Sequence, residues 1–396
     1  MQCGRPLLLR QPFAPDAFDQ VILGCVNVIA DEMNPARVAA LRLGMGESMV
    51  AFTVQINCGS GMQSIDTGYR YIQNGTADLI LAGGAESLSH APLVFSNRAV
   101  AWYGKLFAAR GLVARLEAFL SVRPSFFKPI IGLERGLTDP ITDLNMGQTA
   151  ELVGHMFHVT RRQADEYAAE SQQRLAAAQK NGLLADEVEP AFARDGTLFD
   201  HDDGVRTDST ADTLAKLKPA FERPWGKVTP GNSSQITDGA SWVILASEDA
   251  VKEHKLTPKA VIVDSEWSAL DPSVMGLGPV YCSTSILKRH NLGLGDIELW
   301  ELNEAFAAQV LGCLAAWKDD EFCRDALGLS AAAGAIPRDR LNVDGGAIGA
   351  GHPVGASGNR IVLHLVNAMK RLGYKRGIAT ECIGGGQGGA MLIETV

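Results

Sequence analysis

The stretch VAFTVQINCGSGMQSIDTGYRYI, residues 50–72, decides the fold, because its hydrophobic period changes at Cys58. Before Cys58, apolar side chains recur at every second position from Val50 to Ile56, which predicts a buried strand. After Cys58, apolar side chains recur at spacings of three and four as far as Ile72, which predicts a helix. The pattern therefore places Cys58 in a strand-to-helix turn.

This position favours chemistry at the thiol of Cys58. The unpaired N–H groups and the positive end of the helix dipole favour an anion, so we expect a lowered thiol pKa. Gly59 and Gly61 allow a tight turn and the close approach of another group. Cys58 is thus a candidate thiolate nucleophile. The alternative is a buried structural cysteine, because free cysteine is among the most buried residue types.

Composition restricts the class of protein. The chain has 396 residues, 46% of them hydrophobic and 20% charged, which indicates a globular protein of roughly two or three domains. The net charge of -9 argues against nucleic acid as a partner. The cysteines are dispersed and show no zinc-like spacing, so we expect no metal site and a reducing compartment. The start, MQCGRPLLLRQP, lacks a signal-peptide core and no apolar run reaches membrane-spanning length, so the expected location is cytoplasmic.

Strands alternate with helices around Cys58. Residues 19–28 and 79–86 read as strands, and residues 35–43 read as a helix that Asn34 can cap. This alternation implies a parallel sheet covered on both faces. Residues 239–247, GASWVILAS, return to strand character and are expected to complete this first sheet.

The alternation stops between residues 88 and 238, so this region is predicted to be an insertion. One helix is predicted over residues 98–120. A second is predicted over residues 160–180, opened by a capping box of Thr160 and Gln163 and ended near Gly182.

The second half repeats the first. The strand at residues 297–303 and its following helix parallel VILGCVN and its helix. The glycine-led helix at residues 355–372 parallels the helix after Cys58, and the strand at residues 377–386 parallels LILAGGAE. Two similar units that face each other place their helix-leading loops at a shared cleft.

Three segments of the second half carry unusual residues beside such loops. Asn303 follows a strand in NEAFA, where a helix N-cap is the alternative. His352 lies among glycines in DGGAIGAGHPVGASG, where a core histidine is the alternative. Cys382 ends a strand in CIGGGQGG, where a buried cysteine before a tight hairpin is the alternative. Nucleophilic catalysis by cysteine needs a base, and chemistry through a carbanion needs a second acid/base and an oxyanion site; with Cys58, these residues meet those needs.

At these residues the chain closely resembles the thiolase family. INCGSGMQSI is similar to the family's nucleophile motif, NEAFA to its asparagine motif, GGAIGAGHPVGASG to its histidine motif and CIGGGQG to its second-cysteine motif. GNSSQITDGA, residues 231–240, is a fifth match. The resemblance runs from about Asp19 to the C-terminus.

The resemblance implies an α/β fold of two βαβαβαββ halves packed as five layers, α/β/α/β/α, with a loop domain inserted in the first half. The implied divisions are residues 1–87 completed by 239–250 for the N-terminal half, 88–238 for the inserted loop domain, and 251–396 for the C-terminal half.

The resemblance also implies the roles of the site residues. Cys58 is the acylated nucleophile, His352 activates it, and Cys382 is the acid/base that acts on the acetyl-CoA carbanion. One oxyanion hole uses His352 and a water held by Asn303, and the other uses the N–H groups of Cys58 and Gly384. The residues expected to contact CoA are Ser234, Arg206 and Met146.

Two segments bear on the substrate. Asn145 precedes Met146 where thiolases of acetoacetyl-CoA often carry histidine, and residues 124–151 and 318–340 resemble thiolases of fatty-acid β-oxidation, including those that partner a hydratase/dehydrogenase subunit. This favours thiolytic cleavage of 3-ketoacyl-CoA by CoA. The alternatives are an acetoacetyl-CoA thiolase and a non-catalytic acyl-binding or scaffold protein, and Cys382 argues against a condensing enzyme. No cofactor is implied beyond CoA as a substrate, and a homodimer or tetramer is expected.

The N-terminus departs from the repeat. The second half has an opening strand at residues 260–265 and a helix at 281–290, whereas the best apolar stretch before Val21 is Pro6 to Leu9. By resemblance the chain omits the family's first strand, which we expect to be central in its sheet and costly to lose, at about 1 to 3 kcal/mol per buried unpaired group. We expect the natural start to lie upstream; the alternative is that Pro6 to Leu9 replaces the strand in part.

Overall fold

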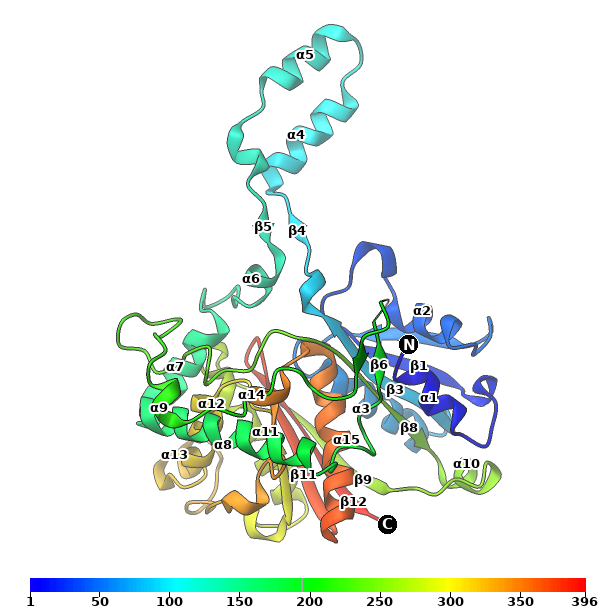
Figure 1. Cartoon of the computed structure of the whole chain (residues 1–396), viewed down its shortest axis with the longest axis vertical. Coiled ribbons are helices and arrows are strands. Elements are labelled where there is room, and N and C mark those ends of the chain that lie inside the picture. Colours follow the sequence, from blue (N-terminus) through cyan, green and yellow to red (C-terminus); the bar gives the residue numbers. More distant parts are fainter. Residues whose placement is uncertain (194) are drawn as a thin grey trace.

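The computed structural model describes residues 1–193 and 195–396 and is built around two four-stranded sheets (Figure 1). Their strand orders are β2-β1-β3-β8 and β10-β11-β12-β9. The strands of the first sheet are β1 (Gln20–Gly24), β2 (Val50–Val54), β3 (Leu79–Ser87) and β8 (Asp238–Ala246). Those of the second are β9 (Ala260–Ala269), β10 (Leu299–Leu302), β11 (Arg376–Ile383) and β12 (Gln387–Thr395).

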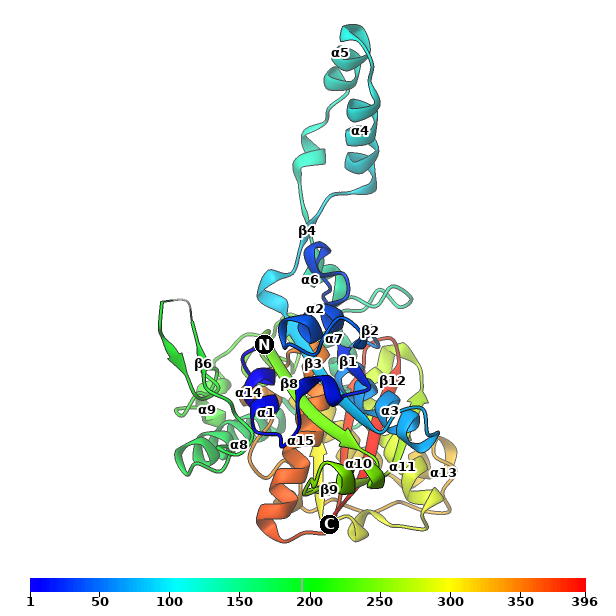
Figure 2. The ribbon, with the colours of Figure 1, turned by 90° about the vertical axis from the view of Figure 1, so that its right-hand side faces the viewer.

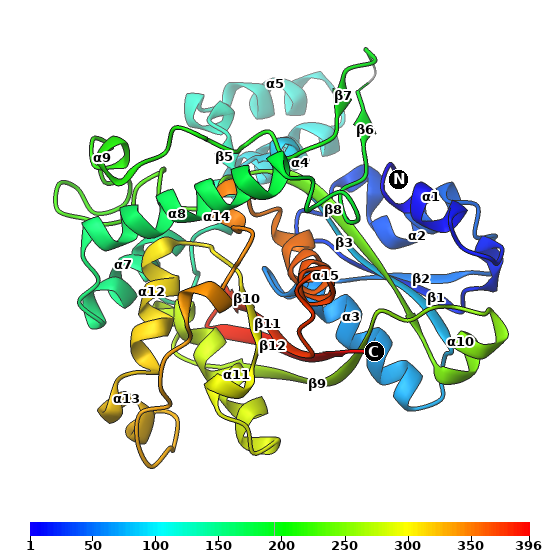
Figure 3. The same ribbon diagram turned by 60° about the horizontal axis from the view of Figure 1, so that its bottom comes forward.

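Helices form the other layers, and the expected five-layer α/β fold is confirmed. Helices α3 (Ser60–Gln73) and α15 (Val354–Leu372) pack on each other between the two sheets (Figure 3). Helix α2 (Pro35–Arg42) covers the outer face of the first sheet, and α11 (Gly278–Arg289) covers that of the second. The backbones of the two central helices approach closely at Gly61. A Cβ there would lie 2.7 Å from the backbone nitrogen of Asn359, so only glycine fits this position.

The two sheets repeat one topology, as the sequence predicted. In each, the first two matching strands are parallel, β1 with β3 and β10 with β11. The next strand is antiparallel, β8 to β3 and β12 to β11. Strand β8 therefore joins the first sheet from beyond the inserted region, as expected from GASWVILAS.

The opening strand of the second half lies at an edge, so the expectation of a central position for it is wrong. Strand β9 pairs antiparallel with the outer side of β12 and has no further neighbour in the sheet. Over the described residues, the matching side of β8 carries no strand. Strand order is set by long crossovers rather than by local pattern, which is why the sequence misplaced it.

The stretch Pro6 to Leu9 is helical, so it does not replace a strand. It lies in α1 (Gly4–Leu9), whose Leu8 is buried in one cluster with Leu43 and with Trp242 of β8. The helix covers the sheet and adds nothing to its hydrogen-bond ladder.

Local signals around Cys58 are mostly confirmed. Helix α3 begins just after it, and the Asn34 side chain caps α2 by accepting a hydrogen bond from the Arg37 N–H. The expectation of a buried β2 is wrong, since β2 lies at the sheet edge and Val50 is 56% exposed. An alternating apolar pattern does not distinguish an edge strand from a central one.

The inserted region differs from the predicted single helix over residues 98–120. The chain forms two helices, α4 (Asn97–Ala108) and α5 (Leu112–Leu120), broken at Gly111, which has φ of 85°. The other long helix is confirmed: α8 (Arg161–Lys180) has the capping box of Thr160 and Gln163.

Helices α4 and α5 form an arm, here defined as residues 93–131. Strands β4 (Leu93–Val94) and β5 (Ile130–Ile131) pair at its base, and the two helices stand clear of the body (Figures 1 and 2).

The remaining elements are shorter or surround the core. They are α6 (Gly132–Gly136), α7 (Met146–Met156), β6 (Ala191–Phe192), β7 (Leu198–Phe199), α9 (Ala211–Leu214), α10 (Glu248–Glu253), α12 (Ala307–Ala316), α13 (Asp320–Asp325) and α14 (Ala347–Ala350). No helix in the described chain is long and apolar enough to cross a membrane.

Candidate active site

Cys58 lies half-buried in the turn between β2 and α3. The preceding residue, Asn57, has φ of 46°, a left-handed conformation that asparagine tolerates better than most residues. The Ser60 hydroxyl fixes the turn, because it accepts the Ile56 N–H at 2.9 Å and donates to the Asn57 carbonyl at 2.7 Å. A strained backbone held by its own hydrogen bonds presents the thiol at the start of α3.

The hairpin after β11 meets this turn from the far end of the chain. The side-chain amide of Asn57 donates to the Gly384 carbonyl at 2.7 Å. The N–H groups of Gly384 and of Cys58 itself act on the Cys58 sulfur and favour its thiolate. Cys382 is fully buried, and charge on Cys58 raises its pKa, so the two thiols face one region. The structure thus brings Cys58, Cys382 and Gly384 together.

The thiol of Cys58 is protonated in the resting protein, and not a thiolate as we expected. Burial first, and the neighbouring Glu381 carboxyl second, raise the pKa of Cys58 to about 12 against the lowering effect of the two N–H groups. Burial also raises the pKa of Cys382 well above its usual value. The expectation of a lowered thiol pKa is therefore wrong, because lost hydration outweighs the N–H groups and the dipole at the helix start. Cys58 needs a base when it reacts.

His352 has the state that such a base needs. It lies buried in the loop before α15, and burial lowers the pKa of His352 to about 4, so the ring is neutral. Its Nδ1 is 2.6 Å from the Ser357 hydroxyl, which in turn donates to the Pro353 carbonyl at 3.2 Å. A hydroxyl has one proton, so Nδ1 donates to Ser357 and Nε2 keeps its lone pair.

Asn303 faces that lone pair from the end of β10. Its Nδ2 is 3.5 Å from Nε2 of His352. Its Oδ1 is buried and has no hydrogen-bond partner among the described residues, so it suits a bound water. The helix N-cap alternative is wrong, since the N-cap of α12 is Phe306.

Two buried carboxylates that sequence reasoning missed hold the loops of the site. Glu86, near the end of β3, accepts the N–H groups of Val26 at 3.1 Å, Asn27 at 2.9 Å and Gly355 at 2.9 Å. It thereby joins the loop after β1 to the start of α15. A carboxylate inside the apolar strand LILAGGAES was the available signal, because such a group is rarely buried without partners.

Glu304 does the same in the second half. It accepts hydrogen bonds from the Tyr167 hydroxyl at 2.8 Å, the Ser171 hydroxyl at 2.6 Å and the Asn342 amide at 3.0 Å. These contacts fasten α8 of the inserted region beneath the loop that leads to His352. Glu304 is part of the NEAFA motif, but the sequence indicated a role only for Asn303 of that motif.

Two of the residues expected to contact CoA border this centre. The N–H of Ser234 donates to the Ala305 carbonyl at 3.0 Å, just beyond Asn303. Met146 opens α7 and packs with Cys382, and a Cβ on Gly384 would lie 3.2 Å from its sulfur.

Arg206 lies farther out. Its side chain is exposed, and its loop is joined to that of Ser234 where Gln235 donates to the Gly204 carbonyl at 2.8 Å. The Gln235 carbonyl in turn accepts the His352 N–H at 3.0 Å. The structure brings the loop of Arg206 beside the site without placing its guanidinium at the reacting groups.

The arrangement provides a thiol nucleophile, a neutral imidazole, a second thiol, and backbone and amide donors. These groups are of the kinds that acyl transfer through a cysteine thioester requires, with a second thiol to move a proton at carbon. No group of three or more potential metal ligands gathers anywhere in residues 1–193 or 195–396.

Comparisons with known proteins agree with this chemistry. A family model described as "Thiolase, N-terminal domain" matches residues 2–249, and one described as "Thiolase, C-terminal domain" matches residues 256–395. A β-ketoadipyl-CoA thiolase of Pseudomonas aeruginosa is 39% identical over 96% of this chain and 88% of its own length. An acetyl-CoA acetyltransferase of Chromobacterium violaceum is 36% identical over 98% of this chain and 91% of its own length. The crystal structure of human mitochondrial 3-ketoacyl-CoA thiolase superposes with a TM-score of 0.84 at 36% identity, covering 99% of this chain and 91% of that one.

Proposed function

Because this chain belongs to the thiolase family, we propose that it cleaves 3-ketoacyl-CoA with CoA, giving acetyl-CoA and a shortened acyl-CoA. It is an acyltransferase, and in the proposal the acyl group is carried by Cys58. One observation carries the proposal: the turn of Cys58 and the hairpin after Cys382, from opposite ends of the chain, meet where the Asn57 side-chain amide donates to the Gly384 carbonyl at 2.7 Å.

In the first half-reaction, the Cys58 sulfur attacks the C3 carbonyl carbon, and its proton passes to Nε2 of His352. The neutral imidazole supports this role, as does the hydrogen bond at Nδ1, which leaves Nε2 unprotonated. The C2–C3 bond then breaks, and its electron pair goes to C2 of the departing acetyl-CoA. Cys382 protonates C2, which leaves a thioester on Cys58 and a thiolate on Cys382.

In the second half-reaction, CoA attacks the thioester carbonyl carbon and gives its thiol proton to the Cys382 thiolate. The bond from sulfur of Cys58 to the acyl carbon breaks, and His352 returns the proton to that sulfur. Both cysteines and the histidine end as they began, so the reaction needs no other reactant.

Two sets of donors stabilise the charge that develops on oxygen. The N–H groups of Cys58 and Gly384 take the oxyanion formed at the attacked carbonyl. His352 and a water on Asn303 take the enolate oxygen of acetyl-CoA, which the free Oδ1 of Asn303 supports. Each such donor contributes about 3 to 4 kcal/mol in the transition state.

For the acyl chain, we propose a substrate of fatty-acid β-oxidation rather than acetoacetyl-CoA alone. Asn145 replaces the histidine common in short-chain thiolases, and it caps α7 by accepting the Gly147 N–H at 2.9 Å. The second candidate is an acetoacetyl-CoA thiolase, favoured by the name of the relative from Chromobacterium violaceum.

The wider assignments are also proposals. CoA lies along Ser234 and Met146, with Arg206 nearer its nucleotide end. The protein acts in the cytoplasm as a homodimer or tetramer, and its partner class includes a hydratase/dehydrogenase subunit. Its regions are residues 1–87 with 239–250, 88–238, and 251–396, a division that the joining of β8 to the first sheet supports.

A thiolysis assay tests the proposal. Purified protein is given CoA with acetoacetyl-CoA, 3-ketooctanoyl-CoA or 3-ketopalmitoyl-CoA, alongside Cys58→Ala and the control Cys3→Ala, which removes a thiol remote from the site. Cleavage of the longer substrates by the protein and the control, but not by Cys58→Ala, is the expected result. Activity on acetoacetyl-CoA alone supports the second candidate, and no activity in a folded protein contradicts an enzymatic role.

A further inference from the structure

The arm formed by residues 93–131 carries apolar side chains on its outside. Five of the nine residues of α5 are large, apolar and exposed. They are Leu112 at 85%, Val113 at 71%, Leu116 at 56%, Phe119 at 61% and Leu120 at 74%. Their spacing places them on one face of the helix. We call these five residues the α5 stripe.

The α5 stripe points away from the arm's own core. Ala114 and Ala118 lie on the opposite side of α5, and the Ala118 carbonyl accepts the indole N–H of Trp102 at 2.8 Å. Trp102 is buried against Phe126 within the arm. The arm therefore has a folded interior, and the stripe is additional apolar surface that the described chain leaves uncovered, which is unusual for a helix in water.

Charge on the arm has the opposite sign to charge on the rest of the protein. Six basic residues and one acidic residue, Glu117, give the arm a net charge of +5 in a chain whose total is -9. All six basic side chains are exposed: Arg98, Lys105, Arg110, Arg115, Arg123 and Lys128. Arg110 lies in the turn between α4 and α5, and Arg115 lies within α5 itself.

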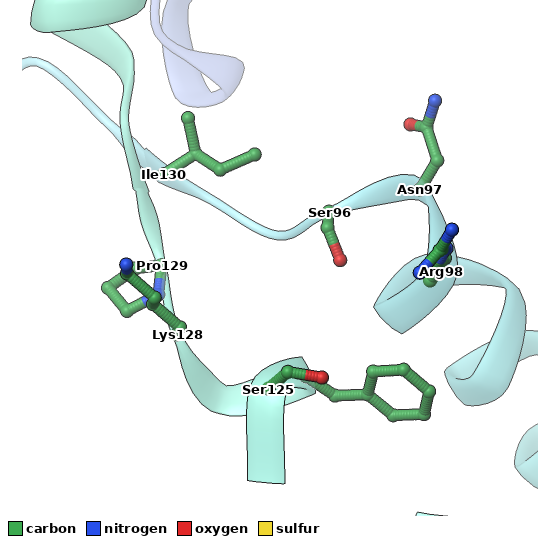
Figure 4. Close-up of a pocket in the computed structure, with 8 residues that line it drawn as sticks. Ser96, Asn97, Arg98, Ser125, Lys128, Pro129 and Ile130 are labelled. Atoms are coloured by element: carbon green, nitrogen blue, oxygen red, sulfur yellow. The ribbon is translucent and has the colours of Figure 1, made fainter. Parts of the chain in front are cut away.

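Two of these basic residues border a hollow nearer the base. It has a volume of about 430 Å³ and opens between the start of α4 and the turn at residues 124–127 (Figure 4). Arg98 and Lys128 line it together with the hydroxyls of Ser96 and Ser125. Cationic side chains form strong charge-assisted hydrogen bonds with anionic groups such as phosphate.

We propose that the arm docks this protein on an anionic lipid surface, with the α5 stripe lying in the interface. A short helix with an apolar face and flanking basic residues binds in the plane of a bilayer rather than across it, and α5 has only nine residues. The basic residues add attraction to acidic headgroups. Because the arm stands clear of the body, its end reaches a flat surface without obstruction (Figures 1 and 2). The inference is independent of the proposed reaction.

Vesicle co-sedimentation tests this docking. The purified protein is mixed with vesicles of pure phosphatidylcholine, and separately with vesicles that also contain phosphatidylglycerol. We expect binding to the anionic vesicles that weakens as salt is raised, and much weaker binding to the neutral ones.

Three variants identify the surface. Leu116→Glu with Phe119→Glu is expected to lower vesicle affinity by more than about a hundredfold, because two buried apolar groups are lost. Arg110→Gln with Arg115→Gln is expected to lower it by about thirtyfold. Leu9→Glu, which changes an equally exposed leucine on α1, is expected to bind as the unchanged protein does. Melting temperature and circular dichroism show that each variant is folded.

Three results overturn the proposal. The first is a folded protein that stays in the supernatant with anionic vesicles. The second is binding that the stripe variant retains in full. The third is stripe-dependent self-association in gel filtration without vesicle binding, which would assign the stripe to a second copy of this chain.

Discussion

The two halves of this protein share a topology but use the ends of their strands differently. Near the end of β3, Glu86 ties the loop after β1 to the start of α15 and touches no reacting group. In the second half, Asn303 follows β10 and Cys382 lies near the end of β11, and both face the site. In the proposed reaction, the first half contributes Cys58. The fold thus fixes where loops converge, and the residue placed there decides whether a loop reacts or holds its neighbours.

The largest expected effect comes from removing the reactive residue at the end of β11. Cys382→Ala should lower the rate of thiolysis by about a thousandfold, because proton transfer at C2 loses its acid. Steady-state kinetics with 3-ketooctanoyl-CoA measures this. Cys282→Ala is the matched control. Cys282 lies on α11, is as fully buried as Cys382, and has its sulfur 3.4 Å from the hydroxyl of Thr380 in β11. A similar loss of rate in both variants would show that Cys382 affects the rate through packing and not through proton transfer.

Asn303 provides the next effect. Asn303→Ala should lower kcat by about a hundredfold and leave the melting temperature within a few degrees, because Oδ1 of Asn303 holds the water of one oxyanion hole and the side chain caps no helix. Kinetics and thermal unfolding are measured on one preparation. A large loss of stability with little loss of kcat would make Asn303 a structural residue.

His364 sharpens the comparison by showing that the second half also contains purely structural contacts. Its Nδ1 is 2.6 Å from a carboxylate oxygen of Glu187, and its Nε2 is 3.6 Å from Glu301 and 3.5 Å from Asp344. Although burial opposes the charge, the surrounding carboxylates raise the pKa of His364 to about 9.

Because the folded pKa lies above the unfolded value, the protonated ring contributes stability that is complete below about pH 6.5 and is lost as pH rises through about 9. The contribution is about 3 kcal/mol. Urea unfolding from pH 6 to pH 10 should therefore show a falling free energy of unfolding that is much flatter in His364→Gln. Parallel curves for the two proteins would show that protonation of His364 does not contribute to the pH dependence of stability.

Glu86 gives the smallest effect and the clearest contrast with Cys382. Glu86→Gln keeps the shape but replaces one acceptor oxygen by a donor, so one of three N–H groups loses its partner. The expected cost is about 1 to 3 kcal/mol of unfolding free energy, with kcat changed by less than about threefold. A collapse of kcat in a stable variant would give Glu86 a part in the chemistry.

Much of the site was readable from sequence because its residues lie beside local signals. A change of hydrophobic period marked Cys58, and glycine-rich loops marked His352 and Cys382. What the sequence misjudged depends on distant neighbours. The pKa of Cys58 is set by burial against other segments, and the edge position of β9 is set by crossovers.

The arm illustrates the same limit. An apolar face on a helix has the same sequence pattern whether it is packed or exposed. The pattern of residues 112–120 therefore did not indicate that the α5 stripe faces outward. The break between α4 and α5 rests on one glycine at positive φ, Gly111, inside an otherwise helical pattern. A predicted single helix would have run through it.

The most direct test of the account is to locate the acyl group. The protein is incubated with octanoyl-CoA in the absence of an acceptor, digested, and its peptides are measured by mass spectrometry. We predict an octanoyl thioester on the peptide that contains Cys58, none on the peptide that contains Cys382, and loss of the adduct in Cys58→Ala. Octanoyl groups on Cys382, or no adduct in a folded protein, would contradict the division of labour between the two halves.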